Sequence, residues 1–124
     1  MKYRLTKEAQ ADIASILRRT KKLFGPLQVS TYAKIIEGGI AMIAADPARP
    51  SIIERNDLRP GVRSLHLELV TRRRRSASHM IYFVEVRDAD GDPKVVVIGV
   101  LHEKMEPKRR LNQALRSLDR LDAQ

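Results

Sequence analysis

Apolar side chains recur every three or four positions along the first third of the chain, which is the spacing of one helix face. Residues 7–24 carry one such stripe, Gly25-Pro26 interrupts it, and a second stripe continues as far as Ile43. The two stripes consist of Ala9, Ile13, Ile16, Leu17, Thr20 and Phe24, then of Val29, Ala33, Ile36, Ile40 and Ile43. Because the connection is short, we expect the two helices to form an antiparallel hairpin. We also expect Gly38-Gly39, inside the second stripe, to let the first helix approach closely.

The hydrophobic period changes after residues 46–61, whose Pro, Asp, Arg and Asn content indicates a loop. Strands are expected to begin at Val62, Ala77 and Lys94, and the first of them alternates as far as Leu69. The other two are apolar on both faces in their middle, as interior strands are. The residues between these strands, 71–76 and 88–93, are expected to form an exposed loop and a tight turn.

The two ends of the chain complete the pattern. Lys2–Leu5 can form a short strand, and Thr6 is a suitable N-cap for the first helix. Pro107 suits the first turn of a closing helix, whose apolar stripe is Leu111, Ala114, Leu115, Leu118 and Leu121. The order β-α-α-β-β-β-α predicts an α+β fold in which an N-terminal helical hairpin packs on a small antiparallel β-sheet. We expect one domain over residues 1–124, with a C-terminal helical extension from about residue 107.

Charge is the most informative part of the composition. The 124 residues contain 24 Lys and Arg against 15 Asp and Glu, a net charge of +9, which favours polyanionic or acidic partners. Cysteine is absent, which excludes disulfides and thiolate metal sites and fits a reducing compartment. No stretch has the length of a signal peptide or a membrane span, so we expect a cytoplasmic protein without membrane contact.

Four short segments, taken in order, resemble the RelE/ParE toxin superfamily. They are Tyr3–Ala9 followed by Asp12-Ile13, the turn Asp57–Arg63, the strand Ser76–Phe83 and the strand Val97–His102. Each is weak alone, but together they lie on the matching elements and span residues 2 to about 107. The resemblance implies the same β-α-α-β-β-β-α fold and the toxin component of a type II toxin–antitoxin system.

Within this superfamily the sequence is closer to the ParE-type toxins. That branch implies an inhibitor of DNA gyrase with no catalytic residues and no cofactor, neutralised by a cognate acidic antitoxin through which the complex binds operator DNA. The alternative is a RelE-like endonuclease that cleaves mRNA on the ribosome, for which Arg63, His79 and His102 would be the catalytic residues. RelE-type toxins often use a C-terminal tyrosine, whereas the last tyrosine here is Tyr82, inside a strand. An enzyme is therefore the less favoured reading.

Arginines form the candidate surface for the target. Arg59, Arg63, Arg72, Arg73, Arg74 and Arg75 could contact nucleic acid or an acidic protein surface, since guanidinium groups bind phosphate and carboxylate bidentately. The alternative at Arg63 is a structural salt bridge. For Arg72 to Arg75 the alternative is a solvated loop, but four arginines in a row without a balancing acid favour binding.

The other candidates concern the antitoxin and the histidines. Leu23, Leu27 and Ile35 lie off the main helical stripes and are candidate antitoxin contacts, although an ordinary surface position is the simpler explanation for each. His79 and His102 are expected on neighbouring strands, either as an acid–base pair or as hydrogen-bonding groups that fix strand ends. His66 is expected to be a surface residue. Three scattered histidines without further ligands predict no metal site.

Overall fold

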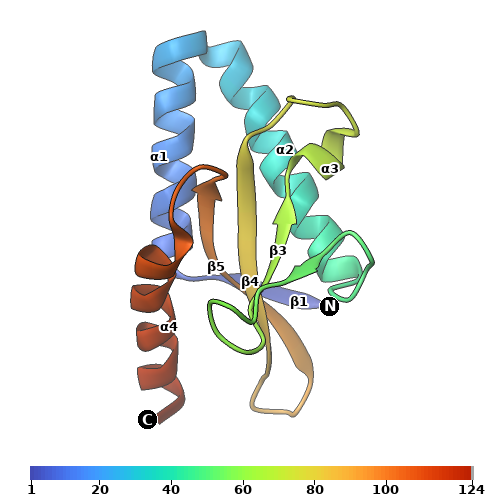
Figure 1. Cartoon of the computed structure of the whole chain (residues 1–124), viewed down its shortest axis with the longest axis vertical. Helices are drawn as coiled ribbons and strands as arrows, with labels where there is room; N and C mark the ends of the chain where they lie inside the picture. Colours follow the sequence, from blue (N-terminus) through green and yellow to red (C-terminus); the bar gives the residue numbers. More distant parts are fainter. Residues whose placement is uncertain (124) are drawn as a thin grey trace.

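The computed structural model contains four helices and a five-stranded sheet (Figure 1). The elements are β1 (Lys2–Leu5), α1 (Lys7–Phe24), α2 (Pro26–Ala45), β2 (Ile53–Glu54), β3 (Arg63–His66), α3 (Glu68–Thr71), β4 (His79–Arg87), β5 (Pro93–His102) and α4 (Pro107–Ala123). The structure describes the backbone of residues 1–123 and the side chains of residues 1–119, so the predicted stripe position Leu121 and the terminal Gln124 lie outside the described side chains. The predicted α+β fold is confirmed. No helix in the described part of the chain is both long and apolar enough to cross a membrane.

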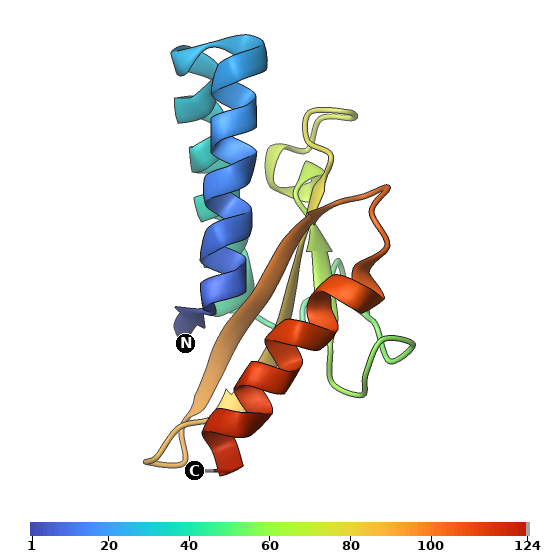
Figure 2. The ribbon, with the colours of Figure 1, turned by 90° about the vertical axis from the view of Figure 1, so that its left-hand side faces the viewer.

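The helical hairpin forms as the sequence predicts. The Thr6 hydroxyl accepts the backbone N–H of Ala9 at 3.1 Å and caps α1. Gly25 ends α1 with a φ of +89°, a conformation that suits glycine, and Pro26 begins α2. The expected burial of Phe24 is wrong, because this side chain is 71% exposed near the tip of the hairpin, which projects past the sheet (Figure 2).

The sheet has the strand order β1-β5-β4-β3-β2. The pairs β3–β4 and β4–β5 are antiparallel as predicted, and β2 also pairs with β3 in antiparallel. By contrast, β1 pairs in parallel with β5, in the register Lys2–Lys94 to Leu5–Val97. The short β2 lies within the segment that was expected to be a loop. The sheet is therefore mixed, and one of its two edge strands, β1, comes from the start of the chain.

The first long strand ends sooner than predicted. Alternation to Leu69 was expected, but β3 stops at His66 and the chain turns into the short helix α3. Leu67 is fully buried, and Val70 packs against the same core, whereas Leu69 is 43% exposed. A single helical turn buries Leu67 and Val70 on one side, which a straight strand could not do because it would place them on opposite faces.

Two hydrophobic cores lie on the two faces of the sheet (Figure 2). The first lies between the hairpin and the sheet, and the second lies between the sheet and α4. Gly38 and Gly39 were expected to let α1 approach α2 closely, but they serve a different contact. A Cβ atom on Gly39 would lie 2.6 Å from Leu67 and 2.8 Å from Ile81, so these glycines let α2 approach α3 and β4.

Candidate functional site

A groove of about 630 Å³ runs between α1 and the end of β5. One wall is a single face of α1, which contributes Asp12, Ile16, Arg19, Leu23 and Phe24 among others, at the spacing of helical turns. The other wall is formed by the start of β4, the end of β5 and the segment that leads into α4. The groove therefore joins elements from the beginning, middle and end of the chain.

The groove has an apolar part and a polar part. Leu23, Phe24 and Met105 are 59%, 71% and 44% exposed, respectively, although all three are large apolar side chains. The polar lining consists of Asp12, Ser15, Arg19, Thr20, Ser78, His79, His102 and Arg110. Exposed apolar side chains beside cations favour an amphipathic, negatively charged ligand.

Only one of the three predicted antitoxin contacts lines this groove. Leu23 does so, whereas Leu27 is 83% exposed at the start of α2 and outside the groove. Ile35 is partly buried against the core between the hairpin and the sheet, so the expectation that it is an exposed apolar residue is wrong.

The predicted neighbours His79 and His102 face each other across β4 and β5. Their ring centroids are 5.3 Å apart in an edge-to-face arrangement, and the two residues are paired in the strand register. The Tyr32 hydroxyl accepts the N–H of Ser78 and is hydrogen-bonded at 2.6 Å to Nδ1 of His79, where the tautomer of the ring decides which of the two donates.

Burial sets the charge of one imidazole, and a backbone contact sets the tautomer of the other. Burial, followed by the nearby His102, lowers the pKa of His79 from 6.5 to about 4, so His79 is neutral at pH 7. His102 accepts the backbone N–H of Lys104 at Nδ1, so its neutral form carries the proton on Nε2. Both rings line the groove, and Nε2–H of His102 can donate a hydrogen bond to an anionic or carbonyl oxygen there.

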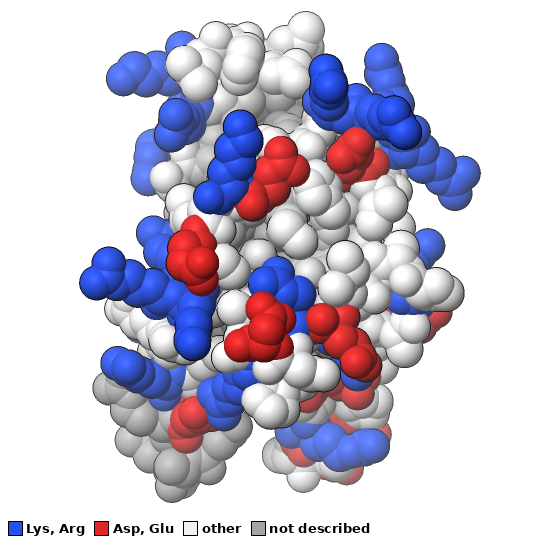
Figure 3. All heavy atoms as spheres, in the orientation of Figure 1, with Lys and Arg blue, Asp and Glu red and all other residues white. Residues whose placement is uncertain are grey.

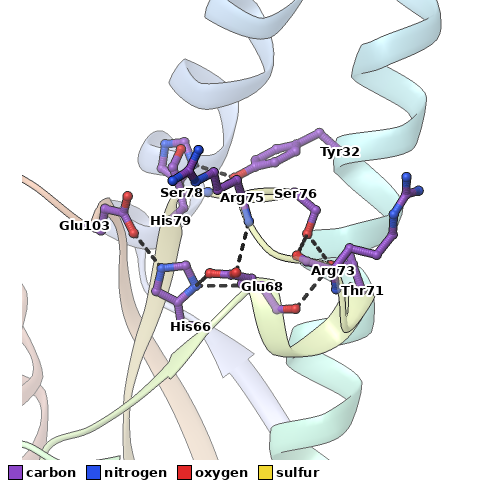
Figure 4. A network of polar contacts seen from close by, with 10 residues as sticks. All are labelled: Tyr32, His66, Glu68, Thr71, Arg73, Arg75, Ser76, Ser78, His79 and Glu103. Atoms are coloured by element: carbon purple, nitrogen blue, oxygen red, sulfur yellow. Dashed lines mark hydrogen bonds and ion pairs between the residues drawn. The ribbon is translucent and has the colours of Figure 1, made fainter.

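His66 is not a simple surface residue, contrary to the expectation. Its Nδ1 accepts the backbone N–H of Glu68, and its Nε2 lies 2.7 Å from the Glu103 carboxylate (Figure 4). The hydrogen bond from His66 lowers the pKa of Glu103. Glu68 in turn accepts the backbone N–H of Arg75 at 2.9 Å. The network thus connects the ends of β3 and β5 to the loop that follows α3.

That loop carries the four consecutive arginines, Arg72 to Arg75, which we call the arginine turn. Arg72 and Arg75 have φ values of +58° and +60°. The side chains of Thr71 and Glu68 accept backbone N–H groups of the turn, and the Ser76 hydroxyl donates to a backbone carbonyl, so the backbone is held in place. All four side chains are exposed, and among residues 1–119 no carboxylate lies within 4.0 Å of their guanidinium groups. Lys and Arg side chains gather over this part of the molecule in Figure 3.

The other two predicted arginines lie elsewhere. Arg59 pairs with Asp119 of α4 at 2.8 Å, and Arg63 donates to the carbonyl of Pro47 at 3.1 Å. Arg63 begins β3, whereas the arginine turn follows the other end of that strand, so the six arginines do not form one patch.

Sequence reasoning missed Asp12 as a functional position. Its carboxylate is buried, accepts the backbone N–H of Val100 at 3.1 Å and pairs with Arg110. Asp12 therefore joins α1, β5 and α4 at the floor of the groove. Nothing in the surrounding segment of α1 indicates this contact, because its partner Val100 lies on β5, far along the sequence.

A second acidic feature lies in the β4–β5 turn. Carboxylate oxygens of Asp88, Asp90 and Asp92 lie within 4.8 Å of one another. Asp88 already accepts the backbone N–H groups of Asp90 and Asp92, so it shapes the turn.

Comparison with known proteins gives consistent results. Residues 3–107 match the family described as "ParE toxin of type II toxin-antitoxin system, parDE". "Toxin ParE" of Escherichia coli is 33% identical over 114 residues, which cover 92% of this chain and 96% of that protein. "Toxin ParE1" of Caulobacter vibrioides is 32% identical over 110 residues, with 88% and 96% covered.

Proposed function

This chain belongs to the ParE toxin family of type II toxin–antitoxin systems, and we propose that it inhibits DNA gyrase and is neutralised by an acidic antitoxin. The observation that carries the proposal is the family match over residues 3–107, which includes the hairpin and the whole sheet. The net charge of +9 supports a negatively charged partner, both for the target and for the antitoxin.

The arginine turn is the proposed contact with the target. Its guanidinium groups are exposed and its backbone is held by hydrogen bonds, so they can bind phosphate or carboxylate groups with little loss of backbone freedom. Gyrase engaged with DNA offers both kinds of group. A contribution from Arg59 or Arg63 stays a prediction, because both side chains already hold partners within the chain.

The antitoxin is proposed to contact the outer side of the helical hairpin through apolar and acidic side chains. Leu23 and Leu27 are the most accessible of the predicted contacts. The proposed complex would bind operator DNA through the antitoxin, and we expect the toxin to act in the cytoplasm without a cofactor.

The pairing of His79 with His102 favours the endonuclease as a second candidate. A general acid at this position would need a protonated imidazole, yet burial lowers the pKa of His79 to about 4. This lowered pKa makes His79 a poor acid near neutral pH, so gyrase inhibition is the first proposal.

A direct comparison of two assays separates the candidates. The purified chain is added to gyrase with relaxed plasmid, and separately to a translation extract in which mRNA cleavage is mapped. Blocked supercoiling with intact mRNA supports the gyrase proposal, whereas cleavage at ribosome-occupied codons with normal supercoiling refutes it.

A matched pair of variants tests the arginine turn. Replacing Arg73 and Arg74 by Ser removes two charges from the arginine turn. Replacing Lys108 and Arg109 by Ser removes two charges from α4. The four side chains are all exposed, so neither variant should disturb the core. The first variant is expected to lose gyrase inhibition and the second to keep it. Equal losses would show that only total charge matters.

A further inference from the structure

The arginine turn has a backbone shape that its own residues do not favour. Arg72 and Arg75 both have positive φ values, which residues other than glycine rarely adopt. In addition, the four exposed guanidinium groups repel one another, and this repulsion favours an open, extended segment. Contacts with the rest of the chain are therefore needed to keep the turn closed.

Glu68 provides contacts at both ends of the turn. It is the first residue of α3, and Oε1 of its carboxylate accepts the backbone N–H of Arg75 at 2.9 Å (Figure 4). Its main-chain carbonyl accepts the N–H of Arg72 at 3.0 Å. The hydrogen bond to the carboxylate is the stronger kind, because its acceptor is charged. A single residue thus holds both positions that have a positive φ.

Glu68 is itself held by residues at the ends of the inner strands. His66, the last residue of β3, accepts the backbone N–H of Glu68 at Nδ1. Because that N–H can only donate, the neutral imidazole carries its proton on Nε2 and donates it to the Glu103 carboxylate at 2.7 Å. Glu103 follows β5, and its own N–H donates to the carbonyl of Ser78, just before β4. The start of α3 is therefore tied to β3, β4 and β5.

We propose that Glu68 is a positioning residue for inhibition of the target: its carboxylate holds the arginine turn in the shape that binds gyrase, and His66 with Glu103 anchors it. The inference rests on the proposed inhibition of gyrase through the arginine turn. A turn that is already ordered in the free protein loses less conformational entropy on binding, so its affinity for the target is higher.

The negative charge of Glu68 distinguishes positioning from a purely electrostatic role. Removing the carboxylate makes the chain more positive, so a surface that attracts an anionic target by charge alone should then bind more tightly. A turn that depends on the hydrogen bond from Arg75 to Glu68 should instead bind more weakly. The two explanations predict changes of opposite sign.

Three single variants test the proposal in the gyrase supercoiling assay. Glu68→Ala removes the charge and the acceptor, so the concentration needed for half-inhibition should rise about three- to tenfold. Glu68→Gln removes the same charge but keeps an oxygen for the Arg75 N–H, and should recover most of the lost potency. Glu37→Ala removes an exposed carboxylate from α2 and is the control, which should not lose potency. Inhibition by Glu68→Ala that equals or exceeds inhibition by Glu68→Gln overturns the proposal.

Amide exchange in the free chain shows whether the turn depends on Glu68. In ¹⁵N-labelled protein, the Arg75 N–H should exchange at least about tenfold faster in Glu68→Ala than in Glu68→Gln, because only the first variant lacks its acceptor. Amides of β4 and β5 should exchange equally in both variants, as an intact sheet requires. Equal exchange of the Arg75 N–H in the two variants contradicts positioning, whatever the target is.

A double variant tests the anchor. His66→Ala removes the acceptor for the Glu68 N–H and the donor to Glu103, so it should weaken inhibition about two- to fivefold. Adding this change to Glu68→Ala should weaken inhibition little further, because both substitutions act on the same turn. Fully additive losses would show that His66 does not act through Glu68.

The outcomes separate this inference from the proposed function. If the unmodified chain does not inhibit gyrase, gyrase inhibition is refuted, and the exchange of the Arg75 N–H still decides whether Glu68 holds the turn. If the unmodified chain inhibits gyrase but the Glu68 variants differ from it only as their charge predicts, positioning is refuted and the gyrase proposal stands.

Discussion

Replacement of Asp12 by Ala should destabilise the fold by about 2–3 kcal/mol. The larger part comes from the buried N–H of Val100, because a hydrogen bond to a charged acceptor contributes roughly 1.5–3 kcal/mol. The ion pair with Arg110 contributes less than about 1 kcal/mol, since the Arg110 side chain is 55% exposed and can be rehydrated. For a chain of this length the loss corresponds to a fall in Tm of roughly 6–12 °C.

Two further variants separate the contributions. Asp12→Asn keeps an oxygen for the Val100 N–H and should lose only about 1 kcal/mol, and Arg110→Ala should lose less than that. The free energy of unfolding is measured by urea denaturation, followed by far-ultraviolet circular dichroism. The reasoning would be refuted if Asp12→Ala were no less stable than Asp12→Asn, because the buried N–H would then not depend on the carboxylate.

Three other predictions concern the core, the histidines and the arginine turn. Gly39→Ala should lower the free energy of unfolding by about 1–3 kcal/mol, because the added Cβ would press on Leu67 and Ile81, and thermal denaturation measures the loss. Gly38→Ala meets only Val70 and should cost less. The free energy of unfolding should fall as the pH is lowered from 6.5 to about 4, because His79 then binds a proton in the unfolded chain but not in the folded one. The variant His79→Gln should show a flatter pH profile over this range when unfolding is measured in urea. Inhibition of gyrase should weaken with added salt, and less steeply in the Arg73→Ser/Arg74→Ser variant; equal salt dependence would contradict a role for these charges.

Local patterns were enough to predict most of the elements. The helical hairpin follows from two stripes of apolar residues separated by Gly25-Pro26, and both inner strands follow from runs that are apolar on both faces. The parallel pairing of β1 could not be predicted in this way, because it joins residues at opposite ends of the chain. The early end of β3 escaped prediction for a related reason, since the burial of Leu67 depends on Gly39 in another element.

The candidate site was predictable only in part. The neighbouring positions of His79 and His102 follow from the order of the strands, and the exposure of Arg72–Arg75 follows from their charge. The role of Asp12 could not be predicted, because neighbouring residues in the sequence do not show that its carboxylate will accept a hydrogen bond from the edge of a distant strand. The hydrogen bonds of His66 were missed similarly, since both partners approach only after β3, α3 and β5 are in place.

The parallel pairing of β1 with β5 also affects when the protein can fold. Lys2–Leu5 leave the ribosome first, but their partners at positions 94–97 are synthesised much later, so the sheet cannot close during most of translation. Contacts between such distant positions form slowly, because a large loop must close before they contribute any stability. A newly made chain therefore cannot complete its sheet, or the core between the sheet and the hairpin, until β5 has been synthesised. The groove between α1 and the end of β5 therefore exists only after the chain has been made as far as His102.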